Sequence, residues 1–247
     1  MASGRKQLTM VVIAAGLFAA VMLTGVIGNI IRGNYLAAPL IALALLAAFV
    51  LIWVAVRVNQ RRIQMMFRQP TPDRVIDHYH STLVQARARK VPHAEATTAY
   101  LSALAATVYG QFDRAREELN AVEWDQTPPM YRGHRLHLLA LMELLEKHDP
   151  AGALRLADEA QALERTDPAG GLQILHDAIL VAAGEGDAEA VKRCQRTADR
   201  GAGAMPALCA WALSLYLERD GQLKDTERYR ERVRETVPQF VGLKSRV

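Results

Sequence analysis

Histidine pairs are the residues of this sequence that come closest to a metal-binding pattern. His134 and His137 stand three residues apart, so on a helix they share one face and could bind zinc. No cysteine and no second close pair of ligands accompanies them, which favours a helix surface over a metal centre. His78 and His80 point about 200° apart on a helix and cannot converge on one ion. We therefore expect neither a metal nor a cofactor.

The short motifs that cradle phosphates or activate nucleophiles do not occur. The sequence contains no G-x-x-x-x-G-K-[ST], no H-E-x-x-H and no G-x-S-x-G. The glycine clusters GAGAMP and GEGD follow no strand pattern, so they are typical of turns between helices. Adjacent acids such as Glu117 and Glu118 are typical of solvated helix faces. The sequence therefore predicts a protein that is not an enzyme.

Two long uncharged runs, 8–31 and 33–56, precede the first acidic residue. Each exceeds the roughly 20 residues that a helix needs to cross about 30 Å of hydrocarbon. The alternatives are a buried core helix or, for the first run, a cleaved signal peptide, whose apolar part is shorter and ends in an A-x-A-like site. We predict a membrane hairpin with spans at about 8–31 and 36–56, within an N-terminal domain at 1–58.

Small residues recur at every fourth position along the first run. This spacing allows close packing of helices, against the second span, another copy of the chain or a larger membrane partner. The alternative is the general abundance of small residues in bacterial spans, and a homo-oligomer is left open. The residues of this transmembrane packing stripe are Gly16, Ala20, Thr24 and Gly28.

Positive charge is concentrated next to the two runs. Lys and Arg that flank a span stay on the cytoplasmic side, so both termini are expected there. We predict a multi-pass protein of the bacterial inner membrane, whose basic cluster attracts anionic lipid headgroups of the bilayer by about 1 kcal/mol per residue. The cluster consists of Arg57, Arg61, Arg62 and Arg68.

The rest of the chain is mildly acidic. Residues 91–247 hold 19 Lys and Arg against 24 Asp and Glu, which argues against a nucleic-acid partner. Pro70 and Pro72 break any helix that continues from the second run. We therefore predict a basic juxtamembrane segment and linking helix at 59–92, followed by a helical domain at 93–247.

A small or medium-sized residue recurs along this domain at a helical-hairpin period. Ala115, Ala153, Val191 and Thr226 follow one another at spacings of 38, 38 and 35 residues, each just after a short turn. A period near 34 is typical of helix–turn–helix repeats. One hairpin cannot bury its apolar face alone, so neighbouring hairpins should stack into one core.

The stretch YGQFDRAREEL resembles the tetratricopeptide-repeat (TPR) family. Gly110, Gln111 and Phe112 match the turn of that family, and Ala115 matches its packing alanine. The resemblance covers roughly 96–238, although most of the first-helix Trp, Gly and Tyr signature is missing. It implies an all-α fold in which a two-helix transmembrane hairpin precedes an α-solenoid of about four TPR-like helical hairpins.

The same resemblance implies a concave surface that receives a protein partner. Its expected function is that of a membrane-anchored adaptor or scaffold for protein–protein interaction at the cytoplasmic face of the inner membrane. The alternative is a small integral accessory subunit of a transporter, secretion or motility complex. By the register of the family, the candidate groove consists of residues that could equally pack in the core: Tyr100, Leu138, Met142, His176 and Trp211.

Overall fold

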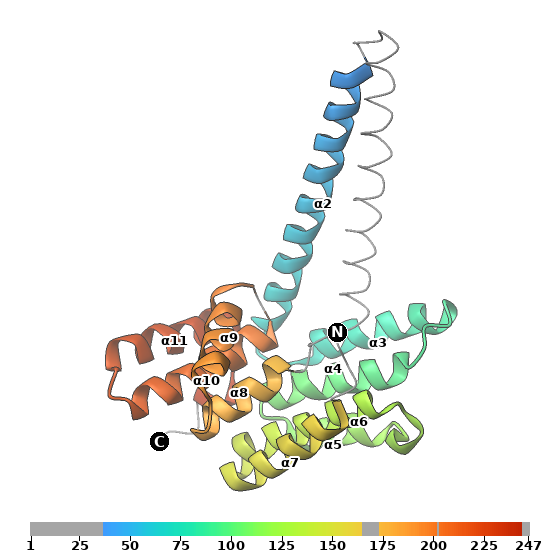
Figure 1. Cartoon of the computed structure of the whole chain (residues 1–247). Helices are drawn as coiled ribbons and strands as arrows, with labels where there is room; N and C mark the ends of the chain where they lie inside the picture. The colour runs from blue at the N-terminus through green and yellow to red at the C-terminus, as the bar shows by residue number, and fades with distance from the viewer. Residues whose placement is uncertain (1–36, 165–172, 202, 244–247) are drawn as a thin grey trace. The chain divides into compact units, whose positions relative to one another are not determined.

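The computed structural model describes residues 37–164, 173–201 and 203–243, and these residues form helices and no strand (Figure 1). The all-α prediction is therefore confirmed for this part of the chain. The chain divides into two compact units, Met1–Gln60 and Arg61–Val247. The predicted first span at 8–31, with its stripe of small residues, lies outside the described residues.

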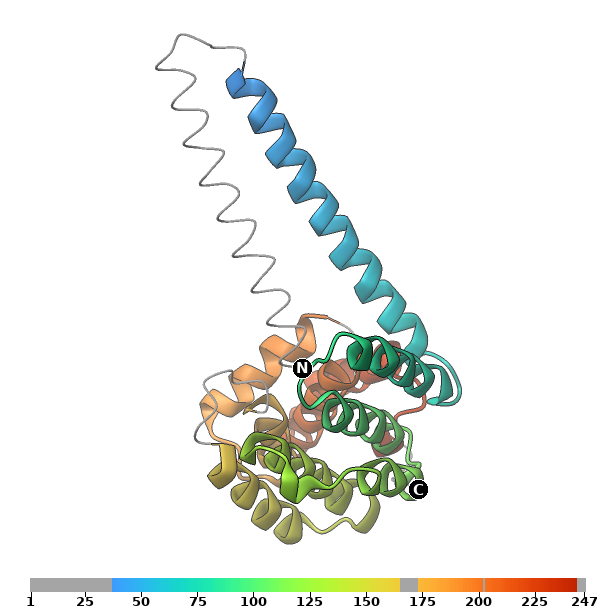
Figure 2. The same ribbon diagram turned by 90° about the vertical axis from the view of Figure 1, so that its right-hand side faces the viewer.

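Helix α2 (Ala37–Phe67) is drawn in blue in Figure 2. No helix among the described residues has both the length and the apolar character that crossing a membrane requires. The prediction of a multi-pass inner-membrane protein, with a second span at 36–56, is therefore wrong for this structure.

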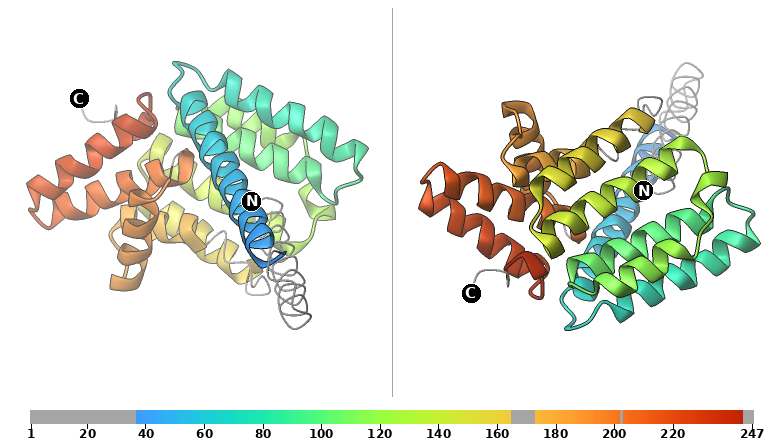
Figure 3. Two further views of the ribbon diagram at one scale, coloured as in Figure 1. Left: turned by 90° about the horizontal axis from the view of Figure 1, so that it is seen from above. Right: turned by 90° about the horizontal axis from the view of Figure 1, so that it is seen from below.

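The second unit consists of helices that pack in consecutive pairs, as expected for an α-solenoid. Contacts join α4 to α5, α6 to α7, α8 to α9 and α10 to α11, and α3 packs against α4. In the view from below in Figure 3, α6 lies beside α7, and α10 lies beside α11. The elements are α3 (Asp73–Ala88), α4 (Ala94–Val108), α5 (Phe112–Asn120), η1 (Trp124–Gln126), α6 (Pro129–Met142), the π-helical turn η2 (Glu143–Lys147), α7 (Pro150–Glu164), α8 (Gln173–Ala183), α9 (Ala188–Asp199), α10 (Ala204–Arg219), α11 (Leu223–Thr236) and η3 (Val241–Leu243).

The four residues of the predicted repeat occupy one equivalent backbone position. Each is the fourth residue of its helix, and its N–H donates to the carbonyl four residues earlier at 2.9–3.1 Å. Three of them are buried, but Val191 is half-buried and Ala190 is buried in its place. Since one residue turns a helix by about 100°, α9 presents its face one position earlier than the other second helices. These residues are Ala115, Ala153, Val191 and Thr226.

The turn within each of the four hairpins contains a residue with a positive φ, which in the third hairpin is Gly184. Gly110 has a φ of 77° and Gly221 a φ of 72°, as a turn glycine should, but His148 occupies this conformation with a φ of 55°. A residue with a Cβ loses about 1–2 kcal/mol in this region, whereas glycine adopts it freely. The second hairpin therefore contains a strained turn where the first and fourth do not.

We expect His148→Gly to raise the free energy of unfolding by about 0.5–1 kcal/mol, because relief of the strained φ exceeds the added entropy of the unfolded chain. Gly110→Ala is the matched opposite change. It should destabilise the domain, since a Cβ at Gly110 would lie 2.8 Å from Cγ2 of Val241. Urea unfolding measures both variants. A loss of stability in His148→Gly would mean that the imidazole contributes more than its backbone costs.

The first and last hairpins of the second unit also contact each other. Helix α4 packs against α10 and against η3. Phe240, which is fully buried, packs on Trp211 with ring centroids 5.7 Å apart. The hydroxyl of Tyr109, directly after α4, donates to the carbonyl of Phe67 at the end of α2 at 2.7 Å. The hairpins of this unit therefore share one core that is closed by the segment after α11.

Candidate functional site

The residues of the predicted groove lie in the interior. Closure of the unit by the segment after α11 explains this for Trp211, because Phe240 and Gly242 cover its indole. Tyr100 packs on His134, with ring centroids 5.1 Å apart. The side chains therefore belong to the core, which was the alternative interpretation of the pattern. Exposed fractions are 2% for Tyr100, 0% for Leu138, 3% for Met142, 4% for His176 and 6% for Trp211.

Buried histidines link neighbouring hairpins in this core. Nε2 of His137, on α6, lies 3.2 Å from Nδ1 of His176, on α8. Burial lowers the pKa of His134 to about 3, and it also lowers the pKa of His176, with the neighbouring His137 as a further cause. Within the described ranges, no group of three or more His, Cys, Asp or Glu could hold a metal. The lowered pKa values favour the neutral forms of His134 and His176 in this core.

An ion pair between a buried carboxylate and a half-buried arginine joins α8 to α9. Nε of Arg193 donates to Oδ2 of Asp177 at 2.7 Å, and its Nη2 donates to Oδ1 at 3.0 Å. The amide of Gln173 donates to the same Oδ1 at 3.0 Å, and Asp177 is fully buried. The hydrogen bonds from Arg193 to the Asp177 carboxylate raise the pKa of the guanidinium. The negative charge of Asp177 on α8 is thus balanced by the guanidinium of Arg193 on α9.

The arginines of the predicted basic cluster have separate surroundings. The Arg57 guanidinium lies over the Trp53 ring, 5.3 Å from its centroid, within the first unit. In the second unit, Arg61 and Arg62 are exposed, and Nε of Arg68 donates to the carbonyl of Glu235 at 3.1 Å. Arg68 therefore contributes to the contact between the start and the end of its own unit.

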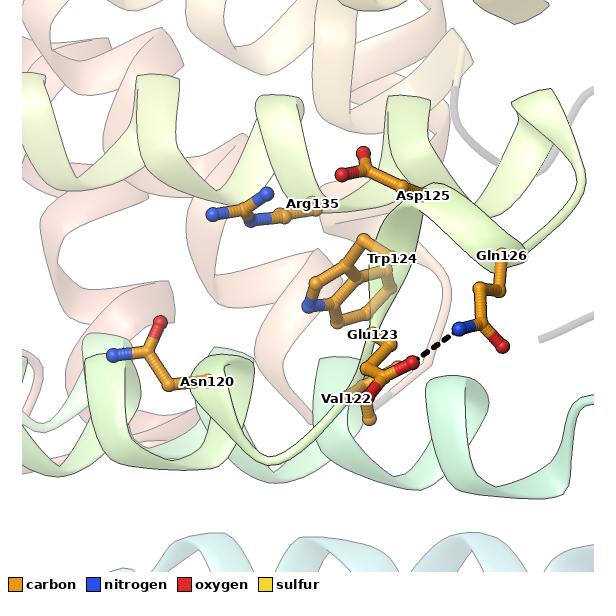
Figure 4. Close-up of a pocket in the computed structure, with 7 residues that line it drawn as sticks. All are labelled: Asn120, Val122, Glu123, Trp124, Asp125, Gln126 and Arg135. Carbon is orange, nitrogen blue, oxygen red and sulfur yellow. Dashed lines mark hydrogen bonds between the residues drawn. The ribbon is translucent and has the colours of Figure 1, made fainter.

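A pocket beside Trp124 was missed by the sequence analysis. It has a volume of about 340 Å³ and lies where the first hairpin connects to the second. Figure 4 labels Asn120 at the end of α5, Arg135 on α6 and the indole of Trp124 from the connection. The only sequence signal was a tryptophan in a segment between two helices. The remaining lining residues are Val122, Glu123, Asp125 and Gln126.

The connection that carries the pocket is fixed by hydrogen bonds. Nε1 of Trp124 donates to the carbonyl of Leu119 at 2.6 Å, and the hydroxyl of Thr127 donates to the carbonyl of Trp124 at 2.6 Å. The amide of Gln126 donates to the carboxylate of Glu123 (Figure 4). Trp124 is buried, so its indole forms a rigid wall of the pocket. A preformed pocket of this kind costs little ordering entropy when a ligand group enters.

Comparison with protein-family models, with curated proteins and with solved structures found no match to this chain. The family resemblance therefore rests on the residues of the repeat alone. The functional argument rests on the geometry of the second unit.

Proposed function

We propose that the chain is a scaffold of TPR-like helical hairpins that binds protein partners. The observation that carries this proposal is the equivalent backbone position of Ala115, Ala153, Val191 and Thr226 in four successive hairpins. Repeated hairpins that share one core create an extended, rigid surface, and proteins use such surfaces mainly for recognition.

The buried polar groups of the second unit support the same proposal. The His137–His176 contact joins two hairpins, and the Arg193–Asp177 pair joins two helices of one hairpin. Both histidines and Asp177 are buried, whereas the Arg193 side chain is 35% exposed. The role of these pairs is to fix how helices stack, which is what a scaffold needs in order to present a surface of constant shape.

Photo-crosslinking in the cells that make the protein tests this proposal. A photoreactive residue at Asn120, which is exposed and lines the pocket, should capture one or a few defined proteins. The matched position is Leu223, 71% exposed at the start of α11, which should give a different or weaker pattern. If neither position nor others on the second unit capture a protein, the scaffold proposal is wrong.

A further inference from the structure

Two arginines on α6 differ from the other half-buried arginines of the second unit. Arg132 and Arg135 make no side-chain hydrogen bond or ion pair within the part of the chain that the structure describes, and Nε of each is buried without an acceptor. The other half-buried arginines all have acceptors: Arg114 with Asp73, Arg116 with Glu146, Arg193 with Asp177, Arg230 with Glu218, and Arg232 with the carbonyls of Ala198 and Gly201.

A buried Nε–H without an acceptor is costly. A buried donor without an acceptor loses its hydration and gains nothing in return, at about 1–3 kcal/mol and more for a charged group. The domain as a whole is acidic, with 24 Asp and Glu against 19 Lys and Arg in 91–247, so carboxylates were abundant enough to pair both groups internally. The Nη groups of these two arginines are not among the buried unpaired atoms, so they remain accessible to an external acceptor.

The two arginines are placed to act together. Arg135 lines the pocket beside Trp124, and Arg132 precedes it by three residues on the same helix. Residues at this spacing have Cβ atoms about 5–6 Å apart, so their guanidinium groups can receive two neighbouring anionic groups. Guanidinium groups bind carboxylates through two parallel hydrogen bonds, which gives both strength and orientation.

We propose that Arg132 and Arg135 bind two carboxylates of an acidic segment of a protein partner, with one side chain seated in the pocket against Trp124. This inference rests on the proposed scaffold function and names the chemistry of its partner. Glu123 and Asp125 at the same pocket repel ligands of high negative charge density, which disfavours phosphate and nucleic acid. Asp and Glu side chains spaced along a peptide carry less charge and can avoid these two acids.

Titration of the full-length chain with a labelled peptide tests the site. The probe is a short, C-terminally amidated peptide in which one serine separates two glutamates. Fluorescence anisotropy measures its binding. We expect binding that weakens with salt, and no binding of the same peptide with glutamine in place of glutamate. Arg135→Gln and Arg132→Gln should each weaken binding about tenfold or more, because each removes a charge-assisted hydrogen bond.

The matched control is Arg155→Gln, which changes an exposed arginine on α7 and should leave binding unchanged. Unchanged melting temperatures would show that the α6 variants fold. Equal binding of the glutamine peptide, or full binding by both α6 variants, would overturn the inference. A protein captured at Asn120 together with no binding of the glutamate peptide would reject this inference and leave the scaffold function standing.

Discussion

Arg193→Leu should lower the free energy of unfolding by about 3–5 kcal/mol. The substitution leaves the carboxylate of Asp177 fully buried, with only the amide of Gln173 as a donor. Removal of one partner of a buried pair exposes the full desolvation cost of the other charge, which exceeds the net value of the intact pair. Urea unfolding followed by far-UV circular dichroism measures the effect, and an unchanged m-value would confirm that the unfolded state is the same.

The control for this prediction removes both charges. Asp177→Leu combined with Arg193→Leu should recover most of the lost stability, because two apolar side chains replace a pair that was costly to bury. If Arg193→Leu alone lowered the free energy of unfolding by less than about 1 kcal/mol, this would contradict the argument. It would mean that the carboxylate reaches water or another donor once the guanidinium is gone.

Acidification from about pH 7.5 to about pH 5 should destabilise the domain by about 2 kcal/mol through His134 alone. Burial lowers the pKa of His134 from 6.5 to about 3 in the folded state. Between these two values the unfolded chain binds a proton that the native state does not, so stability falls as the pH falls below 6.5. His176, whose pKa is also lowered by burial, acts in the same direction.

Urea unfolding at a series of pH values measures this dependence. His134→Gln removes the titrating group, so the slope of the unfolding free energy between about pH 5 and pH 6 should fall by about 1.4 kcal/mol per pH unit. Asp73 and Glu227, whose pKa values are lowered by hydrogen bonds from Arg114 and Arg234, lose their contributions at lower pH and do not interfere. A slope that is equal in both proteins would show that His134 is protonated in the folded state.

The helical character and the hairpin turns could be predicted because they depend on local residues. Gly110 opens the turn before α5, and His148 could be recognised as a departure at the equivalent turn. The burial of Trp211 could not be predicted, because it depends on Phe240, which approaches it only in the folded chain. A position on the first helix of a hairpin faces a groove or a core according to what packs over it, and the repeat pattern does not contain that information.

The Trp124 pocket was beyond prediction for a similar reason. Arg135 is one of many arginines in the sequence, and only the fold shows that its Nε has no acceptor among the described residues. The membrane location was predicted from two runs of uncharged residues, but no helix among the described residues is long and apolar enough to cross a membrane. Local periodicity thus predicted the elements, whereas burial and pairing required the three-dimensional structure.

The contact of α4 with η3 changes how this repeat array should fold. In an open array each repeat touches only its neighbours, so folding can begin anywhere and the end repeats fray separately. Here Gly110 and Val241 meet although they are roughly 130 residues apart, which raises the contact order and slows folding. Since the last segment completes the core of the first hairpin, neither end can open without exposing the other. The second unit should therefore unfold as a single cooperative body.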